Sequence, residues 1–208
     1  MNTIWSQHVQ GTMTLYLSRK LRFDDMFFAQ YKAAFDLDQN ADLRILEIGC
    51  GPGALAEALH RWYPKAHITA IDRDSNFISF AEENIKGVDF MEGDATRLPF
   101  EDNTFDITIS NTVQEHVEPG GICLCLSARK GLRCIAPCLE TTEEEKAFWE
   151  SIPQQEDDME RLGICRFPKS ESEIPASMEE NGFTDVTTGY AVIDLTPDAP
   201  KYPAKMAE

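Results

Sequence analysis

Three glycines stand in the stretch LEIGCGPG, at positions 49, 51 and 53, between a short apolar run and the segment ALAEALHRW. A strand that ends in glycines and leads into a helix exposes backbone N–H groups at the positive helix end, where a ligand can approach the backbone closely. Asp72 ends the next apolar run, HITAID, where an acidic side chain can accept hydrogen bonds from ribose hydroxyls. The spacing therefore predicts a site for a nucleotide-like ligand.

The glycine turn by itself does not identify that ligand. Gly49, Gly51 and Ala54 formally satisfy the dinucleotide-binding pattern. A nicotinamide or flavin dinucleotide, another nucleotide-like cofactor and a purely structural strand-to-helix turn all remain open at this point.

Apolar runs and helical periodicity alternate around the turn. Leu55, Leu59 and Trp62 share one side of an expected helix, which Pro64 closes. Ser75 can cap the next helix. The expected strands are residues 43–49, 67–72, 88–94, 105–111 and 121–127. This alternation predicts an α/β fold, with a doubly wound, mostly parallel sheet and helices on both faces.

The flanking segments have patterns of their own. LRFDDMFFAQYKAAF has an aromatic residue at every fourth position, which predicts one helix with an apolar face made of Phe23, Phe27, Tyr31 and Phe35. SESEIPASMEENGF is typical of a last helix that ends at Gly182, and the following TDVTTGYAVIDL is typical of a strand. ETTEEEKAFWE favours a short helix with a solvated acidic face.

Charge and hydropathy limit the partners. Lys and Arg number 19 against 36 Asp and Glu, a net charge of -17 over 208 residues, which disfavours nucleic acid and anionic membrane surfaces as partners. No stretch approaches the roughly 20 apolar residues that a membrane-spanning helix needs, and the first residues lack the pattern of a secretion signal. We therefore expect a soluble, cytoplasmic protein with no nucleic-acid or membrane partner.

The cysteine spacing does not indicate a metal site. Cys123 and Cys125 alternate within an expected strand, and Cys134 and Cys138 follow at a spacing of four, without a nearby histidine. This arrangement matches no common zinc pattern, and cysteine in a core usually behaves as a small apolar residue. We expect no metal and no disulfide framework.

Motifs beyond the glycine turn narrow the choice of ligand. LEIGCGPG, AIDRD and EGDATRLPFEDNTFDITISN, in this order, resemble the class I S-adenosylmethionine-dependent methyltransferases, in the small-molecule branch related to ubiquinone/menaquinone C-methyltransferases. The resemblance covers residues 43–117 closely and PGGICLCLSARKG more loosely. It implies a Rossmann-like methyltransferase fold, with S-adenosyl-L-methionine across the carboxyl ends of the first strands.

The resemblance also implies roles for individual residues. Glu47 would orient the loop or hold the cofactor's ammonium group through a water molecule, and Asp72 would take the ribose hydroxyls. Asp94 and Ala95 would frame the adenine, while the Asn111 carbonyl would lie near the ammonium group. The full implied cofactor set is Glu47, Gly49, Cys50, Gly51, Gly53, Asp72, Arg73, Asp94, Ala95 and Asn111.

Catalysis would need few side chains, because the sulfonium already activates the methyl carbon and the protein mainly aligns the reactants and excludes water. An acceptor hydroxyl or acidic carbon needs a base, and His116, just past the fourth strand, is the best-placed residue. Tyr16 and Arg19, in LYLSRKLRF, are expected to precede the first helix and are assigned to a lid or to substrate contact. The expected division is a helical lid over residues 1–40, a methyltransferase domain over 41–196 and a tail over 197–208.

The pattern departs from the family between the fourth and fifth strands. Only TVQEHVEPGG is available there, whereas a parallel crossover usually takes at least 10 to 12 residues. Three explanations stay open: a lost crossover helix, unusual pairing of the fifth strand, or residues absent from the chain. Exposed strand edges at this point would favour a homodimer, with strand exchange as one form of it.

Three functions follow from these patterns. The leading one is methyl transfer from S-adenosylmethionine to a small-molecule acceptor. The second is a degenerate, non-catalytic cofactor-binding module, because the departures lie on the acceptor side. The third, a nucleotide-dependent oxidoreductase, rests on the glycine pattern without a second signature.

Overall fold

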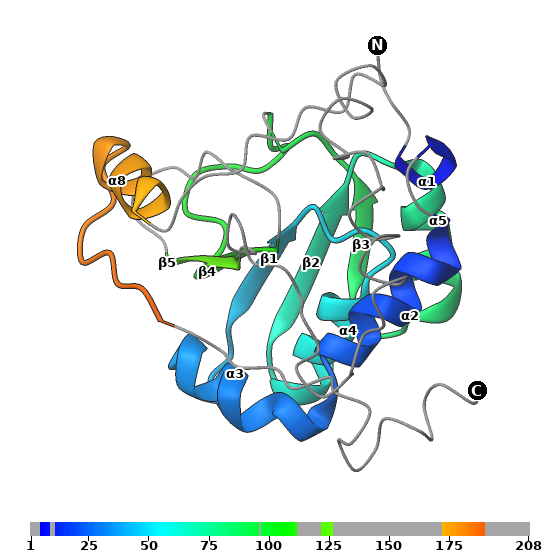
Figure 1. Cartoon of the computed structure of the whole chain (residues 1–208), viewed down its shortest axis with the longest axis horizontal. Coiled ribbons are helices and arrows are strands. Elements are labelled where there is room, and N and C mark those ends of the chain that lie inside the picture. Colours follow the sequence, from blue (N-terminus) through cyan, green and yellow to red (C-terminus); the bar gives the residue numbers. More distant parts are fainter. Residues whose placement is uncertain (1–4, 9–10, 96, 112–121, 127–171, 190–208) are drawn as a thin grey trace, which may run out of the picture.

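A parallel sheet forms the centre of the computed structural model, which describes residues 5–8, 11–95, 97–111, 122–126 and 172–189 (Figure 1). In these residues the strand order is β3-β2-β1-β4-β5, and each strand is parallel to its neighbours. The strands are β1 (Arg44–Ile48), β2 (His67–Asp72), β3 (Asp89–Glu92), β4 (Ile107–Asn111) and β5 (Ile122–Leu126). The chain moves outward from β1 to β3 and then returns to the other side of β1, which confirms the doubly wound α/β fold.

The described helices gather mainly around β1, β2 and β3. In Figure 1, α4 and α5 lie beside these strands and α2 lies against α4 and α5, whereas α8 lies beyond β5 at the opposite edge. The helices are α1 (Trp5–His8), α2 (Thr12–Arg22), the 3-10 helix η1 (Asp25–Phe27), α3 (Phe28–Phe35), α4 (Ala54–Trp62), α5 (Ser75–Asn84) and α8 (Glu173–Glu180). None of these helices combines the length and apolarity needed to cross a bilayer.

The two faces of the sheet are covered differently. Ile45, Ala70 and Ile109 belong to a large core with side chains of α2 to α5, and we call this side the helix-covered face. Leu46, Ile48 and Ile71 form a smaller core with partly buried residues of the segment 93–106, and we call this side the loop-covered face. The alternation of strand side chains separates the two sets. Helices α2 to α5 thus contribute to the helix-covered face, and the small core of the described residues contains no helix residue.

The N-terminal aromatic residues pack as predicted, but not on one helix. Phe23, Phe27, Tyr31 and Phe35 are all buried in the large core. However, α2 ends at Arg22, because the Asp24 carboxylate accepts a hydrogen bond from the Met26 N–H and starts η1. The prediction of one continuous helix was wrong. The aromatic residues keep their four-residue spacing although the backbone breaks at the Asp24 cap.

Local signals located the other helices to within a few residues. Leu55, Leu59 and Trp62 are buried in α4, as predicted. Asp74, not Ser75, caps α5, because its carboxylate accepts from the Asn76 N–H. Aspartate is as good a cap as serine, and it stands one residue earlier.

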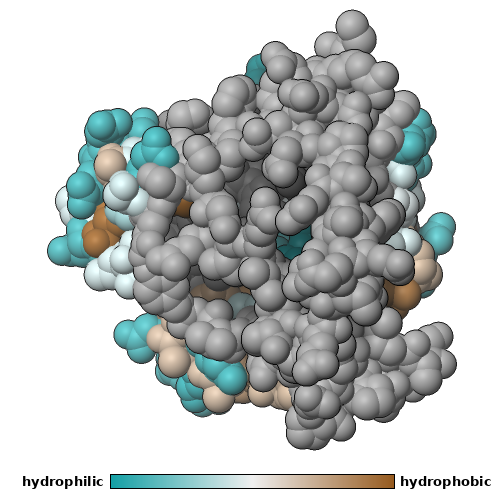
Figure 2. All heavy atoms as spheres, in the orientation of Figure 1, coloured by the Kyte–Doolittle hydropathy of each residue, from teal (hydrophilic) through white to brown (hydrophobic). Residues whose placement is uncertain are grey.

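The C-terminal helix ends where glycine predicted. Gly182 has a φ of +91° directly after α8, and the Phe183 N–H donates to the Met178 carbonyl at 3.1 Å. Residues 184–189 form no strand, contrary to the prediction for TDVTTGYAVIDL. The rest of that segment lies outside the described residues, as do the helix expected for ETTEEEKAFWE and the cysteines at 134 and 138. The surface around α8 mixes hydrophilic and hydrophobic atoms (Figure 2), and α8 contains no buried residue.

The pairing of strand β5 excludes one of the three explanations for the short connection, which is unusual pairing of the fifth strand. Strand β5 pairs parallel with β4, from Ile107 opposite Ile122 to Asn111 opposite Leu126, so its pairing is the usual one. The connecting residues 112–121 lie outside the described residues. Ten residues can span about 33 Å, whereas the return along a five-residue strand needs about 16 Å. The connection is therefore long enough for this pairing.

Candidate functional site

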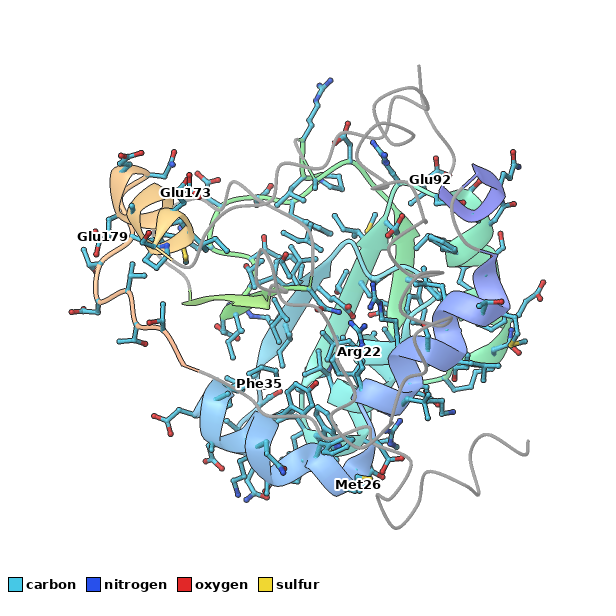
Figure 3. All side chains as sticks on the ribbon, viewed as in Figure 1. Arg22, Met26, Phe35, Glu92, Glu173 and Glu179 are labelled. Atoms are coloured by element: carbon cyan, nitrogen blue, oxygen red, sulfur yellow. The ribbon has the colours of Figure 1, made fainter. Side chains whose placement is uncertain are left out.

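The residues predicted for the cofactor meet at the carboxyl edge of the sheet. The loop after β1, the end of β2, the segment after β3 and the end of β4 all lie there, because the strands are parallel. The strand order reverses between β1 and β4, and open α/β sheets bind ligands at such a switch point. Figure 3 shows Glu92, at the end of β3, on the same side of the molecule as α1, with Met26 at the opposite end.

Positive backbone angles shape the glycine loop. Gly49, Gly51 and Gly53 have φ values of +69°, +54° and +86°, which other residues adopt only with strain. The N–H groups of Gly49 and Cys50 both donate to the Ile71 carbonyl, at 2.8 and 2.9 Å. These two bonds fasten the start of the loop to β2, and Gly53 leads directly into α4.

Asp72 is held by two backbone N–H groups. Gly51 donates to its Oδ2 at 2.8 Å and Asp74 donates to its Oδ1 at 2.9 Å. A carboxylate has about four acceptor positions, so about two remain for other donors. The predicted ribose-binding residue therefore has a fixed position and keeps acceptor capacity on both oxygens.

Glu47, in β1, has a side chain that is buried against the first turn of α4. Its side chain is 2% exposed, and it accepts a hydrogen bond from the Ala56 N–H. Its Oε2 atom has no hydrogen-bond partner in the described part of the chain. A buried polar atom without a partner is costly, which marks this oxygen as an acceptor for a water molecule or a bound group.

Carboxylates dominate the electrostatics of this edge. Burial raises the pKa of Glu47 well above its ordinary value, and the charge of Asp72 raises it further. Burial also raises the pKa of Asp72, against the lowering effect of the Asp74 and Gly51 N–H groups. The pKa of the buried Cys50 thiol rises through burial and through both carboxylates. A cationic ligand would relieve this repulsion, whereas an anionic ligand would add to it.

The other residues predicted for the site are described mainly by their exposure and their place in the fold. Arg73 is exposed beside Asp72. Asp94 forms a turn, in which the Arg97 N–H donates to its carbonyl at 3.0 Å, and Ala95 is partly buried against the loop-covered face. Asn111 ends β4 and is partly buried. The predicted base, His116, lies outside the described residues.

Tyr16 and Arg19 lie inside α2 and not before the first helix, which corrects the sequence interpretation. The Tyr16 hydroxyl donates to Glu57 Oε2 of α4 at 2.9 Å, and its ring packs edge-on against Phe80 of α5. These contacts anchor α2 to the domain. The Leu15 Cδ2 atom lies 3.7 Å from the position that a Cβ on Gly51 would take, so α2 also contacts the glycine loop.

Two neighbours of Asp72 escaped the sequence analysis. Asp74 is 4% exposed and accepts hydrogen bonds from both the N–H and the hydroxyl of Ser6 in α1. The position of Asp74 directly before a predicted helix was a usable signal, because aspartate favours that position. Ser6 lies 68 residues away and carried no signal in the sequence.

A family comparison agrees with this geometry. Residues 45–128 match the sequence model of a family described as "Methyltransferase domain". This segment is similar to the methyltransferase domains of that family. It contains β1 from Ile45 onward, β2 to β5, the glycine loop and Asp72, and the match agrees with the family predicted from the sequence.

Relatives of the methyltransferase domain resemble it over part of their length. Malonyl-[acyl-carrier protein] O-methyltransferase of Bacillus anthracis is 47% identical over 74 residues, which is 35% of this chain and 27% of that protein. Fatty-acid O-methyltransferase of Mycolicibacterium smegmatis is 31% identical over 147 residues, which is 57% of this chain and 53% of that protein. The chain thus spans about half or less of the length of these curated relatives.

Two solved structures share the fold of the domain. A methyltransferase from Aquifex aeolicus, described as SAM-dependent, has a TM-score of 0.51 at 19% identity, over 80% of this chain and 87% of that one. Phosphoethanolamine N-methyltransferase 2 of Haemonchus contortus, in complex with S-adenosyl-L-methionine, has a TM-score of 0.56 at 18% identity, over 87% of this chain and 44% of that one. At this identity the likeness concerns the fold.

Proposed function

We propose that this protein binds S-adenosyl-L-methionine at the carboxyl edge of the sheet and transfers its methyl group to a small-molecule acceptor. The observation that carries the proposal is the buried Glu47 carboxylate beside the three-glycine loop, with an oxygen that has no partner in the described residues. Such an oxygen needs a donor, and the ammonium group of S-adenosylmethionine supplies one, directly or through a water molecule.

The residues of the edge fit the other parts of this cofactor. Asp72 has remaining acceptor positions for the two ribose hydroxyls. We assign the adenine to Asp94 and Ala95, with Arg73 beside the adenosine. The Asn111 carbonyl would receive the ammonium group, and Gly49, Cys50, Gly51 and Gly53 would lie under the methionine part.

Charge distinguishes this cofactor from a nicotinamide dinucleotide. S-adenosylmethionine carries a sulfonium and an ammonium against one carboxylate, so its net charge is positive. A dinucleotide instead places a negative pyrophosphate on the glycine loop. Glu47 and Asp72 make this edge acidic, which favours the cation and weighs against the oxidoreductase interpretation.

The protein's role in the reaction would be alignment and proton removal. When bound, the cofactor would supply a methyl carbon that its sulfonium already activates, so the chain's residues would mainly orient the acceptor and exclude water. We assign His116 to the proton that an acceptor hydroxyl or acidic carbon loses in this step.

A labelled-methyl assay with a panel of acceptors tests the proposal. The panel takes a fatty acid and malonyl-[acyl-carrier protein] from the names of the two relatives above, and a quinone from the ubiquinone/menaquinone C-methyltransferases that the motifs resemble. We expect label in at least one acceptor, and loss of turnover in His116→Ala with unchanged cofactor affinity. Normal turnover in His116→Ala would remove His116 from the mechanism.

A non-catalytic cofactor-binding module is the second candidate. The observation in its favour is the connection of ten residues between Asn111 and Ile122, on the acceptor side of the switch point. Cofactor binding without label in any acceptor of the panel would favour this candidate over the enzyme.

The N-terminal segment and the assembly are separate proposals. We infer that residues 1–40 form a lid, because Leu15 contacts the glycine loop and Tyr16 anchors α2 on α4. The homodimer and the cytoplasmic location remain predictions from the sequence. Light scattering that finds a monomer at every concentration would contradict the dimer.

A further inference from the structure

The Asp72 carboxylate depends on two backbone donors, and the N-terminal segment contacts both of the residues that provide them. One donor is Gly51, and Leu15 Cδ2 of α2 lies 3.7 Å from the position that a Cβ on Gly51 would take. The other is Asp74, which Ser6 of α1 binds. The two helices therefore support the carboxylate from both of its sides.

Asp74 has more contacts than a helix cap needs. Its Oδ1 accepts from the Asn76 N–H at 3.1 Å, which completes the cap of α5. Its Oδ2 accepts from the Ser6 N–H at 2.7 Å, and its Oδ1 also accepts from the Ser6 hydroxyl at 3.1 Å. The Asn76 side-chain amide in turn donates to the Ser6 hydroxyl at 3.0 Å. Ser6 thus provides the donor for Oδ2 that water provides at an ordinary exposed cap.

We propose that Ser6 and Asp74 are positioning residues for the cofactor's ribose. When α1 binds the Asp74 side chain, it fixes the Asp74 backbone N–H, and that N–H fixes Asp72 Oδ1. The inference rests on the proposed function, because it takes Asp72 as the acceptor of the ribose hydroxyls. It adds α1 to the cofactor site, although α1 is far from the glycine loop in sequence.

The experiment measures recognition of the ribose hydroxyls separately from overall binding. Calorimetry compares S-adenosylhomocysteine with its analogue that lacks both hydroxyls, for the full chain and for each variant. In the unmodified protein we expect the hydroxyls to strengthen binding by at least about tenfold, as for hydrogen bonds to a charged group. If Ser6 and Asp74 position Asp72, their variants lose this ratio and leave the affinity for the analogue unchanged.

Three variants separate the contributions. Asp74→Ser keeps a side-chain oxygen that can cap α5, but the serine side chain is too short to reach Ser6. Ser6→Pro removes the backbone N–H and the hydroxyl that donate to Asp74, at a position in the first helical turn that tolerates proline. For both we expect the ratio to fall by about tenfold, and for Ser6→Ala, which keeps the backbone donor, by about threefold. Ser18→Ala is the matched control, because in the described residues its hydroxyl donates to the Leu15 carbonyl within α2. Its ratio should stay unchanged.

Hydrogen exchange gives a second readout that does not depend on the variants. Coupling between two sites is reciprocal, so S-adenosylhomocysteine should slow exchange of the Ser6 N–H, and the analogue without hydroxyls should slow it less. An unchanged ratio in folded Asp74→Ser and in Ser6→Pro would overturn the inference. If Asp74→Ser does not fold, the two Ser6 variants and the exchange of Ser6 decide the outcome.

The inference and the proposed function fail in different ways. Absence of S-adenosylhomocysteine binding to the unmodified protein would contradict both. Binding with a hydroxyl ratio near one would contradict the role of Asp72, and with it the inference, while the methyltransferase proposal would stand.

Discussion

The helix-covered and loop-covered faces of the sheet differ in how they are packed. On the helix-covered face, Tyr31 stacks on Trp62 with ring centroids 5.1 Å apart, within a core that extends from α2 to α5. In the described residues, the apolar core of the loop-covered face is small: Leu46, Ile48 and Ile71 are buried beneath the segment 93–106. Glu47 alternates with Leu46 and Ile48, so it lies on the helix-covered side. The cofactor edge should therefore depend mainly on helix packing.

The largest difference between the faces should come from core truncation. Leu59 is fully buried on the helix-covered face, and Leu59→Ala should cost about 3 kcal/mol of unfolding free energy through lost burial and a cavity. Phe100 is partly buried on the loop-covered face, with its ring 4.8 Å from that of Phe105. Phe100→Ala should cost about 1.5 kcal/mol, because the exposed segment can relax. Urea unfolding measures both, and an equal or reversed order would contradict the comparison.

A matched pair of glycines sharpens the comparison at the site. A Cβ on Gly53 would lie 2.8 Å from Ile85 Cδ1, at a φ of +86°. Gly53→Ala should therefore cost about 2 kcal/mol of stability and weaken cofactor binding. A Cβ on Gly93 would lie 3.4 Å from Ile71 Cδ1, without a positive φ. Gly93→Ala should change stability by less than about 0.5 kcal/mol. Thermal unfolding of the two variants would refute this account if Gly93→Ala were the more destabilised.

The buried carboxylate makes the helix-covered side sensitive to pH. The pKa of Glu47 is raised above its ordinary value of 4.5, mainly by burial. The stabilisation from its protonated form is therefore complete below 4.5 and is lost as pH rises through the pKa of the folded state. Glu47→Gln has no carboxyl group to ionise, so the stability of this variant relative to the unmodified protein should increase from pH 5 to pH 8. The variant should bind the cofactor more weakly. Urea titrations at both pH values measure this trend, and a difference in stability that does not vary with pH would contradict it.

The smallest effect is expected at the opposite edge of the sheet. Asp106 Oδ1 and Oδ2 accept from the Arg44 side chain and backbone, at 3.0 and 2.8 Å, in an exposed position. These hydrogen bonds lower the pKa of Asp106 below its ordinary value of 3.8. The resulting stabilisation is present above that value and is lost as pH falls through the pKa of the folded state. Asp106→Asn should therefore change stability slightly at neutral pH, and less in high salt. An effect as large as that of Leu59→Ala would show that the account misplaces the stabilising contacts.

The sequence predicted the strands well because each is a short apolar run with polar or glycine residues at its ends. Strand β2 matches its predicted range, residues 67–72, and β1 and β5 differ from theirs by one residue at each end. Helix boundaries were harder to predict, because DRDS offers two capping residues in succession and Asp24 interrupts a period that continues across it. Periodicity reports burial, and the buried aromatic residues confirm it, but it does not report a break in the backbone.

The site was only partly predictable for a related reason. Glycines and acidic residues at strand ends can be predicted as site residues from their sequence positions, because parallel strands bring their carboxyl ends together. The contacts of Ser6 with Asp74 and of Leu15 with Gly51 join segments that are far apart in the sequence. A single sequence contains no spacing rule for such contacts, so the structure was needed to find them.

Calorimetric titration of the full chain tests the central claim most directly. We expect S-adenosylmethionine and S-adenosylhomocysteine to bind at one site, a nicotinamide dinucleotide not to bind, and Asp72→Ala to lose affinity for both ligands. Failure of both ligands to bind at about 1 mM, where even a weak site is half filled, would contradict the account.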